Sequence, residues 1–148
     1  MPAEPYIYIA IGIVIAIVIY LLFRTARRRR YVPELIDELE GHDFEAYCAD
    51  LLAKNGFYDV EITKGSGDYG LDILAERDGI TYGIQCKRYD KPIGVAAVQQ
   101  AYAGRDYYRR MVGAVMTNQC FTDAAVKMAQ ALNVILWDRA YIEDLEKA

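Results

Sequence analysis

The sequence holds little of what a zinc site or a disulfide framework requires. Its three cysteines, Cys48, Cys86 and Cys120, lie far apart without a C-x-x-C pair, and His42 is the single histidine. A structural zinc site needs four nearby cysteine or histidine ligands, and a disulfide framework needs cysteines at regular spacings. We therefore expect reduced, buried thiols, and we place His42 at the start of a helix rather than in catalysis.

Basic residues are scarce outside one short run near the N-terminus. Five arginines lie between residues 24 and 30, and removing them together with Glu4 leaves 12 basic and 20 acidic residues, a net charge of −8. This balance argues against a general nucleic-acid coat protein, because binding to phosphates draws on lysine and arginine. Three arginines between residues 105 and 110 form either a local basic patch or a solvated helix face.

Two common catalytic and nucleotide-binding motifs are also missing. The chain has no G-x-x-x-x-G-K-S/T phosphate-binding loop and no G-x-S-x-G nucleophile motif. Residues 65–70 do match G-x-G-x-x-G, but only eight residues separate Gly70 from Gly79, too few for the helix that a dinucleotide site needs. We therefore predict no nucleotide cofactor and assign these glycines to a loop that positions Asp68 and Asp72.

Residues 6–23 form an uncharged apolar run directly before the arginines. As a helix, eighteen residues cover about 27 Å, close to the ~30 Å hydrocarbon core of a bilayer. The basic cluster follows the run, which is the wrong order for a cleaved secretory signal. The positive-inside rule then predicts a single-pass protein of the cell inner membrane, with the N-terminus outside and the C-terminal domain cytoplasmic. The alternative is a buried, β-rich core segment.

The rest of the chain has the pattern of an α/β domain. Strand, helix, strand, helix and strand follow one another after Ile80, an order that requires parallel crossovers, so we predict a mixed β-sheet flanked by helices on both faces. The predicted organisation is a membrane anchor with a basic flank at 1–30, a linker helix at 31–42 and one domain at 43–148. The expected helices are 33–40, 43–54 with Asp43 as N-cap, 95–110, 122–132 with Thr122 as N-cap, and 141–147; the expected strands are 59–63, 71–77, 80–89, 113–117 and 134–137.

The dipeptide Asp78-Gly79 between two apolar runs predicts a β-hairpin with a two-residue turn. In that register the numbers of two paired residues add up to 157. Asp72 therefore lies opposite Gln85, with Cβ atoms about 5 Å apart. Side chains alternate along a strand, so Lys87 shares the face of Gln85. The other face then carries Leu71, Ile73, Ala75, Ile84 and Cys86. A carboxylate, an amide and an ammonium on one face can bind a metal ion and a phosphate together; the alternative is a polar solvent face.

Asp72 followed by Gln85-Cys86-Lys87 resembles the catalytic element of the PD-(D/E)XK nuclease superfamily. The closer resemblance is to the Mrr-type restriction endonuclease catalytic domain, in which glutamine takes the place of the usual glutamate. It runs from about Gly41 to Asp138, and Leu71 stands where the superfamily name has proline. The other landmarks, in order, are Phe44-Glu45, Leu51-Leu52, Asn55-Gly56-Phe57, Gly67-Asp68-Tyr69-Gly70, Thr117-Asn118 and Phe121-Thr122.

The resemblance implies a restriction-endonuclease-like fold and a Mg²⁺-dependent DNA endonuclease that restricts foreign or modified DNA, with Mn²⁺ as an alternative cation. Asp72, Gln85, Glu45 and the backbone carbonyl of Cys86 would hold the metal, and Lys87 would stabilise charge on the phosphate. Glu45 can instead be a helix-dipole partner. The predicted DNA contacts are Asp68, Arg88, Lys91, Thr117, Asn118 and Thr122.

A second class of function stays open. The acidic surface and Gln85 favour a catalytically weak DNA-binding or scaffold module that retains the nuclease fold, whereas Asp72 and Lys87 favour the enzyme. The chain shows no separate reader domain, so target selection would come from this domain, from a partner or from a homo-oligomer.

Overall fold

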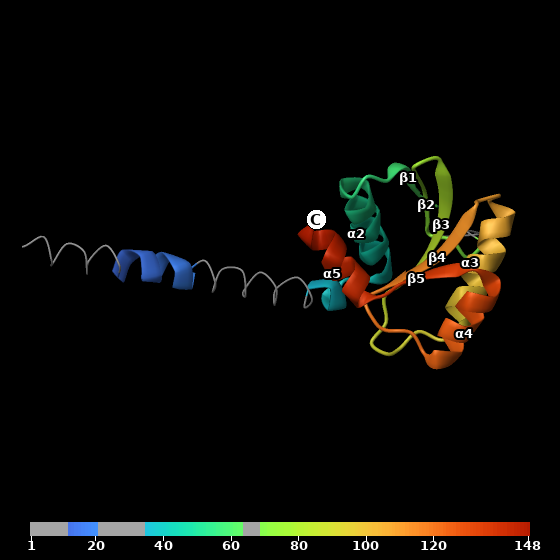
Figure 1. The fold of residues 1–148 in the computed structure, drawn as a ribbon. Helices are drawn as coiled ribbons and strands as arrows, with labels where there is room; N and C mark the ends of the chain where they lie inside the picture. Colours follow the sequence, from blue (N-terminus) through green and yellow to red (C-terminus); the bar gives the residue numbers. More distant parts are fainter. Residues whose placement is uncertain (1–11, 21–34, 64–68) are drawn as a thin grey trace, which may run out of the picture. The chain divides into compact units, whose positions relative to one another are not determined.

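The computed structural model describes residues 12–20, 35–63 and 69–148, and it divides the chain into two units, Met1–Leu35 and Ile36–Ala148. In the first unit residues 12–20 are helical, drawn in blue in Figure 1, and their side chains are exposed. The predicted membrane segment, 6–23, extends beyond the described residues at both ends, and the five arginines lie outside them. Within the described ranges, no helix has both the length and the hydropathy needed to cross a bilayer.

The second unit is built on a mixed sheet of five strands in the order β1-β2-β3-β4-β5. The first three strands are antiparallel neighbours, and β3, β4 and β5 run parallel. The predicted mixed sheet is thereby confirmed. The strands are β1 (Tyr58–Ile62), β2 (Ile73–Arg77), β3 (Ile80–Lys87), β4 (Val112–Thr117) and β5 (Val134–Trp137).

Helices cover both faces of this sheet, as the order of elements predicts. Figure 1 shows α2 and α5 on one face and α3 and α4 on the other. The helices are α2 (Gly41–Lys54), α3 (Val95–Tyr107), α4 (Asp123–Leu132) and α5 (Arg139–Lys147), and residues 35–38 form a further helical turn.

Several helix ends differ from the prediction. Glu40 takes the N-cap position of α2 without a side-chain hydrogen bond, so Asp43 lies in the first turn and is not the cap. The prediction for Thr122 is confirmed, because its side chain accepts a hydrogen bond from the amide of Ala125. Helix α3 ends at Tyr107, so the arginines at 109 and 110 lie beyond it and share no helical face with Arg105.

The two sides of the sheet are packed differently. Small side chains of α3 and α4 bring these helices close to the sheet in a core of Ile93, Ala97, Val98, Ala101, Val115, Ala125, Ala129 and Val134. On the other side α2 buries Phe44, Cys48 and Leu52, and an aromatic group contains Phe57, Tyr82, Trp137 and Tyr141. The close approach of α3 to β3 determines the shape of the site.

Candidate active site

The β2–β3 hairpin has the predicted turn and register. Asp78 and Gly79 both have positive φ, 53° and 78°, as the two-residue turn requires. Arg77 pairs with Ile80, and Ile73 pairs with Ile84. The ladder stops there, because the amide of Asp72 donates to the carbonyl of Ile84 at 2.8 Å, one residue out of register. Asp72 therefore lies at a bend just before β2.

This bend changes the direction of Leu71, which we predicted on the same face as Ile73. Leu71 instead packs against Gly83 of β3 and Gly104 of α3, on the opposite side of the sheet. A Cβ added at Gly104 would lie 2.6 Å from Cγ of Leu71 and 2.8 Å from the carbonyl oxygen of Tyr69. The two glycines thus make the space in which Leu71 is fully buried, and the alternation of side chains ends at Ile73.

The backbone on both sides of Asp72 is held by hydrogen bonds. The amide of Thr63, just after β1, donates to the carbonyl oxygen of Asp72 at 2.9 Å. The hydroxyl of Thr63 donates to the carbonyl oxygen of Leu71 at 2.6 Å. Since the amide of Asp72 is also bonded to Ile84 of β3, hydrogen bonds to two neighbouring segments fix the backbone at Asp72 and thereby the direction of its side chain.

The side chains of Asp72 and Gln85 contact each other, as the register predicts. Oδ2 of Asp72 accepts hydrogen bonds from Nε2 of Gln85 and from the backbone amide of Cys86, the latter at 2.6 Å. Nε2 of Gln85 also donates to the carbonyl oxygen of Cys86 at 3.2 Å. Asp72 and Gln85 are only 7% and 4% exposed, so they are not a polar solvent face. A buried carboxylate needs such donors, because burying an unpaired charge is costly.

Asp72, Gln85 and Lys87 line one cleft of about 510 Å³ between the sheet and α3. Its other lining residues are Tyr69, Gly70, Ala96, Gln99, Gln100 and Ala103. Lys87 is half-buried and is the only basic residue among the described residues that line the cleft. Within the described part of the chain it forms no ion pair. Its ammonium is thus available to an anionic ligand in the cleft.

Hydrogen bonds from Thr117 and Asn118 hold the backbone at the end of β3 and just beyond it. The hydroxyl of Thr117 donates to the carbonyl oxygen of Lys87 at 2.6 Å. The amide of Asn118 binds both the N–H and the carbonyl oxygen of Tyr89, each at 2.9 Å. Both side chains are fully buried. We therefore assign them a positioning role in place of the predicted DNA contacts, because neither can reach a ligand on the surface.

The other predicted contacts lie outside the cleft. Arg88 pairs with Asp90 at 3.0 Å, Lys91 is exposed, and Thr122 caps α4. Asp68 falls outside the described residues.

Glu45 lies on α2, beyond the opposite face of the sheet, and its carboxylate is 3.3 Å from Nδ1 of His42. It does not line the cleft. The structure therefore brings together three of the four predicted catalytic side chains.

The thiol of Cys86 points away from the cleft toward α2. A hydrogen bond with Cys48 and the burial of the sulfur raise the pKa of Cys86 well above its usual range, and the charges of Asp72 and Glu45 add to the rise. The thiol is therefore protonated at neutral pH. Only the backbone carbonyl of Cys86, which contacts Gln85, is in a position to act as a ligand in the cleft.

The donor atoms of the cleft fit a hard divalent cation. They are a carboxylate, a backbone carbonyl and a side-chain amide, and Mg²⁺ characteristically binds one or two carboxylates while it keeps several waters. Within the described ranges there is no group of three or more histidine, cysteine, aspartate or glutamate side chains that could hold a metal. The oxygen set of Asp72, Gln85 and Cys86 is of the kind that a hard divalent cation prefers.

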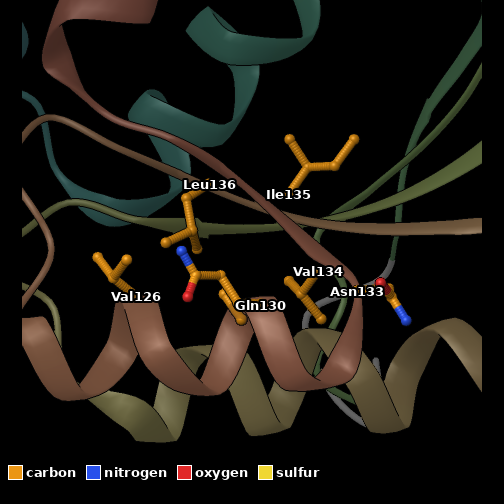
Figure 2. Close-up of a pocket in the computed structure, with 7 residues that line it drawn as sticks. Val126, Gln130, Asn133, Val134, Ile135 and Leu136 are labelled. Atoms are coloured by element: carbon orange, nitrogen blue, oxygen red, sulfur yellow. The ribbon is translucent and has the colours of Figure 1, made fainter.

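A second hollow, of about 580 Å³, lies between α4 and the edge strand β5. Figure 2 shows Val134 and Leu136 turned toward α4 and Ile135 on the other side of the strand. Its lining residues are Val126, Ala129, Gln130, Asn133, Val134, Ile135 and Leu136, none of which is ionisable. Without an acid, a base or a nucleophile, this hollow offers no catalytic chemistry.

The contribution of α3 to the cleft was missed from the sequence. Ala96, Gln99, Gln100 and Ala103 are exposed and spaced by three and four residues, so they form one stripe of the helix. The two glutamines were the available signal, because they follow a run of small and apolar residues, Val95–Val98, at the start of the helix.

A family model described as a restriction endonuclease, Mrr_cat, matches residues 36–145. No curated protein matches the sequence. Among solved structures, AF1548, a protein of unknown function, is 24% identical with a TM-score of 0.62, covering 73% of this chain and 66% of its own.

Two restriction endonucleases are also similar in structure. AspBHI, described as DNA modification-dependent, is 18% identical with a TM-score of 0.60, covering 79% of this chain and 34% of its own. MspJI, solved with a 27-mer oligonucleotide, is 16% identical with a TM-score of 0.59; the match covers 81% of this chain and 30% of MspJI. At these identities the likeness establishes the fold. The chain spans about a third of the length of either enzyme.

Proposed function

Because this chain belongs to the Mrr_cat family of restriction endonucleases, we propose that its Ile36–Ala148 unit hydrolyses phosphodiester bonds of DNA in the cleft of Asp72, Gln85 and Lys87. One observation carries the assignment to this cleft. A buried carboxylate, an amide and an ammonium without an ion-pair partner in the described residues converge where a strand approaches α3. Such an arrangement can hold a cation and a phosphate at the same time.

Asp72, the carbonyl of Cys86 and the side chain of Gln85 would hold a divalent cation, which we propose to be Mg²⁺, with Mn²⁺ as an alternative. When bound, the cation supplies Lewis-acid stabilisation of the phosphate and lowers the pKa of a coordinated water. Among the described residues of the cleft lining, Asp72 contributes the only carboxylate. Gln85 contributes an uncharged group where the wider superfamily has a carboxylate, so this site carries one negative charge less.

Lys87 would bind the scissile phosphate and stabilise the charge that develops on it during hydrolysis. A compact ammonium on a flexible stem suits this role. The backbone of Lys87 is anchored by Thr117, so the side chain extends from a fixed point of β3. Among the described residues of the lining, the ammonium of Lys87 is thus the one basic group that would position the phosphate.

Glu45 is kept as the proposed second carboxylate on the basis of the family match alone, because its side chain does not line the cleft. Lys91, which is exposed, is kept as a DNA contact together with Asp68, Arg88 and Thr122.

Foreign or modified DNA is the target that we propose. The support is the family itself and the description of AspBHI, a structural relative, as DNA modification-dependent. Target selection would come from this unit, a partner protein or a homo-oligomer.

We propose further that residues 6–23 anchor the protein in the cell inner membrane, with the nuclease unit in the cytoplasm. The part of this run that the structure describes, 12–20, is helical and presents exposed isoleucine and valine side chains. Fractionation followed by a carbonate wash tests the anchor, and release of the full-length protein into the wash contradicts it. Protease protection of the C-terminal domain in intact spheroplasts would confirm the orientation, and its digestion there would reverse it.

The second candidate is a DNA-binding or scaffold module that cleaves weakly. The observation in its favour is Gln85, because the amide adds no negative charge to the metal-binding oxygens and donates to two of them.

Plasmid cleavage separates the two candidates. Full-length protein in mild detergent is incubated with supercoiled plasmid and Mg²⁺, beside Asp72→Ala and beside the wild type in chelator. Nicking or linearisation by the wild type alone, and only with metal, supports the nuclease. DNA retention without any cleavage in Mg²⁺ or Mn²⁺ supports the binding module.

A further inference from the structure

Two exposed tyrosines form a stacked pair at the rim of the cleft. The ring centroids of Tyr69 and Tyr107 are 3.8 Å apart, with an interplanar angle of 22°. The two residues are 57% and 56% exposed. Tyr108 packs edge-on against Tyr107 at 5.1 Å. The rings of Tyr69 and Tyr107 are therefore open to solvent next to the proposed reaction site, and neither ring belongs to the hydrophobic core.

The pair is held in place by the backbone beneath it. Tyr69 has a positive φ of 49°, and Gly70 follows with a φ of 84°. Gly70 lies against α3 so closely that an added Cβ would be 2.9 Å from the carbonyl oxygen of Gln100. A hydrogen bond with Tyr69 also raises the pKa of Tyr107. The two rings are thus arranged before any ligand arrives, which lowers the entropic cost of binding to them.

The stacked pair is continuous with the cleft. Tyr69 itself lines the cleft, and Tyr107 continues the exposed stripe of α3 that begins at Ala96 and passes through Gln99, Gln100 and Ala103. This stripe carries no charge. A strand whose phosphate is bound at Lys87 would find amides and small side chains along α3, and then the aromatic rings.

The charges of the cleft are compatible with a contribution of aromatic rings to nucleic-acid binding. Nucleic-acid binding usually draws its affinity from lysine and arginine, yet Lys87 is the only basic residue in the described lining. Aromatic rings are the alternative source of affinity, because any nucleobase can stack on them whatever its sequence. Inside a paired duplex both faces of a base are covered by its neighbours, so only an unpaired base can use the rings.

We propose that the Tyr69–Tyr107 pair binds an unpaired nucleobase of the substrate strand, so that this cleft prefers DNA containing unpaired nucleotides over fully paired duplex. The inference rests on the proposed nuclease function, because it identifies the class of DNA which the same cleft takes. The base adds a further layer to the tyrosine pair while its strand passes along α3 toward Lys87.

Binding in the presence of a chelator tests the proposal without cleavage. The probe is a short single-stranded oligonucleotide that contains 2-aminopurine, whose fluorescence falls when the base stacks on a ring; the same strand in a perfect duplex is the comparison. Full-length protein is titrated as wild type, Tyr107→Leu, Tyr107→Phe and Tyr69→Leu. Tyr58→Leu is the matched control, because Tyr58 is 47% exposed but pairs with Glu76 near the Asp78-Gly79 turn, at the far end of the hairpin.

The wild type, Tyr107→Phe and Tyr58→Leu should quench the single-stranded probe and bind it more tightly than the duplex. Tyr107→Leu and Tyr69→Leu should lose the quenching and about tenfold or more in affinity, the usual loss for one stacking contact. Thermal melting checks that each variant is folded. Equal affinity of Tyr107→Leu and Tyr107→Phe, or equal affinity of the wild type for single strand and duplex, would overturn the proposal.

Failure of this inference and failure of the nuclease assignment give different results. Plasmid cleavage by the wild type combined with unchanged binding by Tyr107→Leu overturns the stacking site alone. Tyrosine-dependent quenching in a protein that cleaves no DNA supports the stacking site and overturns the nuclease.

Discussion

Nε2 of Gln85 donates hydrogen bonds to both Oδ2 of Asp72 and the carbonyl oxygen of Cys86. The partly positive amide group therefore lies between two of the oxygens that we propose as metal ligands. For these oxygens to hold a cation, Nε2 of Gln85 would have to leave them, and a rotation of the side-chain amide would bring Oε1 of Gln85 to the same place. This relationship makes Gln85 the most informative position for mutation.

Gln85→Glu should make both stability and cleavage depend more steeply on Mg²⁺. In chelator, the new carboxylate faces Asp72 in a buried site and loses the donated hydrogen bonds, so the free energy of unfolding should fall by about 1–3 kcal/mol. Added Mg²⁺ should raise the melting temperature of the variant more than that of the wild type. Thermal melts across a Mg²⁺ series, with plasmid cleavage at each concentration, measure both effects.

If the amide of Gln85 is needed as a hydrogen-bond donor during the reaction, glutamate cannot replace it at neutral pH. Cleavage would then be absent at every Mg²⁺ concentration, although the melting temperature still rises with the metal. That pattern would falsify metal ligation through the oxygen of Gln85.

Asp72→Asn and Lys87→Ala should each reduce cleavage about a hundredfold or more while the domain stays folded. Asparagine keeps an oxygen for the amide of Cys86 but removes the carboxylate of the cleft, and Lys87 is half-buried without an ion pair in the described ranges. The measurements are plasmid cleavage and thermal melting, with Lys127→Ala on α4 as the surface control. Cleavage by Asp72→Asn at the wild-type rate would remove Asp72 from the mechanism.

Gly104→Ala should destabilise the domain, although helix propensity alone favours alanine over glycine by about 1 kcal/mol. The added methyl group would lie 2.6 Å from Cγ of Leu71 and 2.8 Å from the carbonyl oxygen of Tyr69, so the segment before Asp72 must move. We expect a loss of about 1–3 kcal/mol and reduced cleavage. Gly41→Ala is the control, because no atom lies within 4 Å of its added Cβ. Equal melting temperatures for the two variants would contradict this account.

Asp37 should contribute to stability above its unfolded pKa and lose this contribution in acid. Burial by itself raises the pKa of Asp37, but hydrogen bonds from Arg139 and Asn118 outweigh it, and the pKa lies below its usual range. Since the folded pKa is the lower one, the stabilisation is present above about pH 4 and is lost as the pH falls through the folded value. The side chain is 42% exposed, so the effect should be modest.

Asp37→Asn tests this contribution through melting temperatures measured between neutral and acidic pH. The variant should melt below the wild type at neutral pH, and the difference should shrink in acid. Asp144→Asn is the control, because Asp144 forms only an exposed ion pair with Lys147. A difference between Asp37→Asn and the wild type that stays constant with pH would show that the charge of Asp37 is not the cause.

Local patterns were sufficient for the elements of the fold and for one pair of site residues. The Asp78-Gly79 turn admits a single register, which extends to the Ile73–Ile84 pair and leaves Asp72 next to Gln85. Residues that cap or end helices, such as Thr122, act through neighbours a few positions away, which explains why they could be identified. The predicted direction of Leu71 was wrong, because the chain bends at Asp72 and the side chains before it no longer alternate between the two faces of the sheet.

By itself, the sequence determined the mixed sheet, its helices and the pairing of β2 with β3 that leaves Asp72 near Gln85, because each depends on short-range periodicity and on one turn. Only the tertiary structure decided that this polar pair is buried, that α3 supplies the other wall of the cleft, and that Asn118 supports the backbone of Tyr89. It also decided that Tyr69 meets Tyr107. These contacts depend on how closely α3 approaches the sheet. The absence of a side chain at Gly83 and Gly104 permits that approach, but no local pattern in the sequence predicts it.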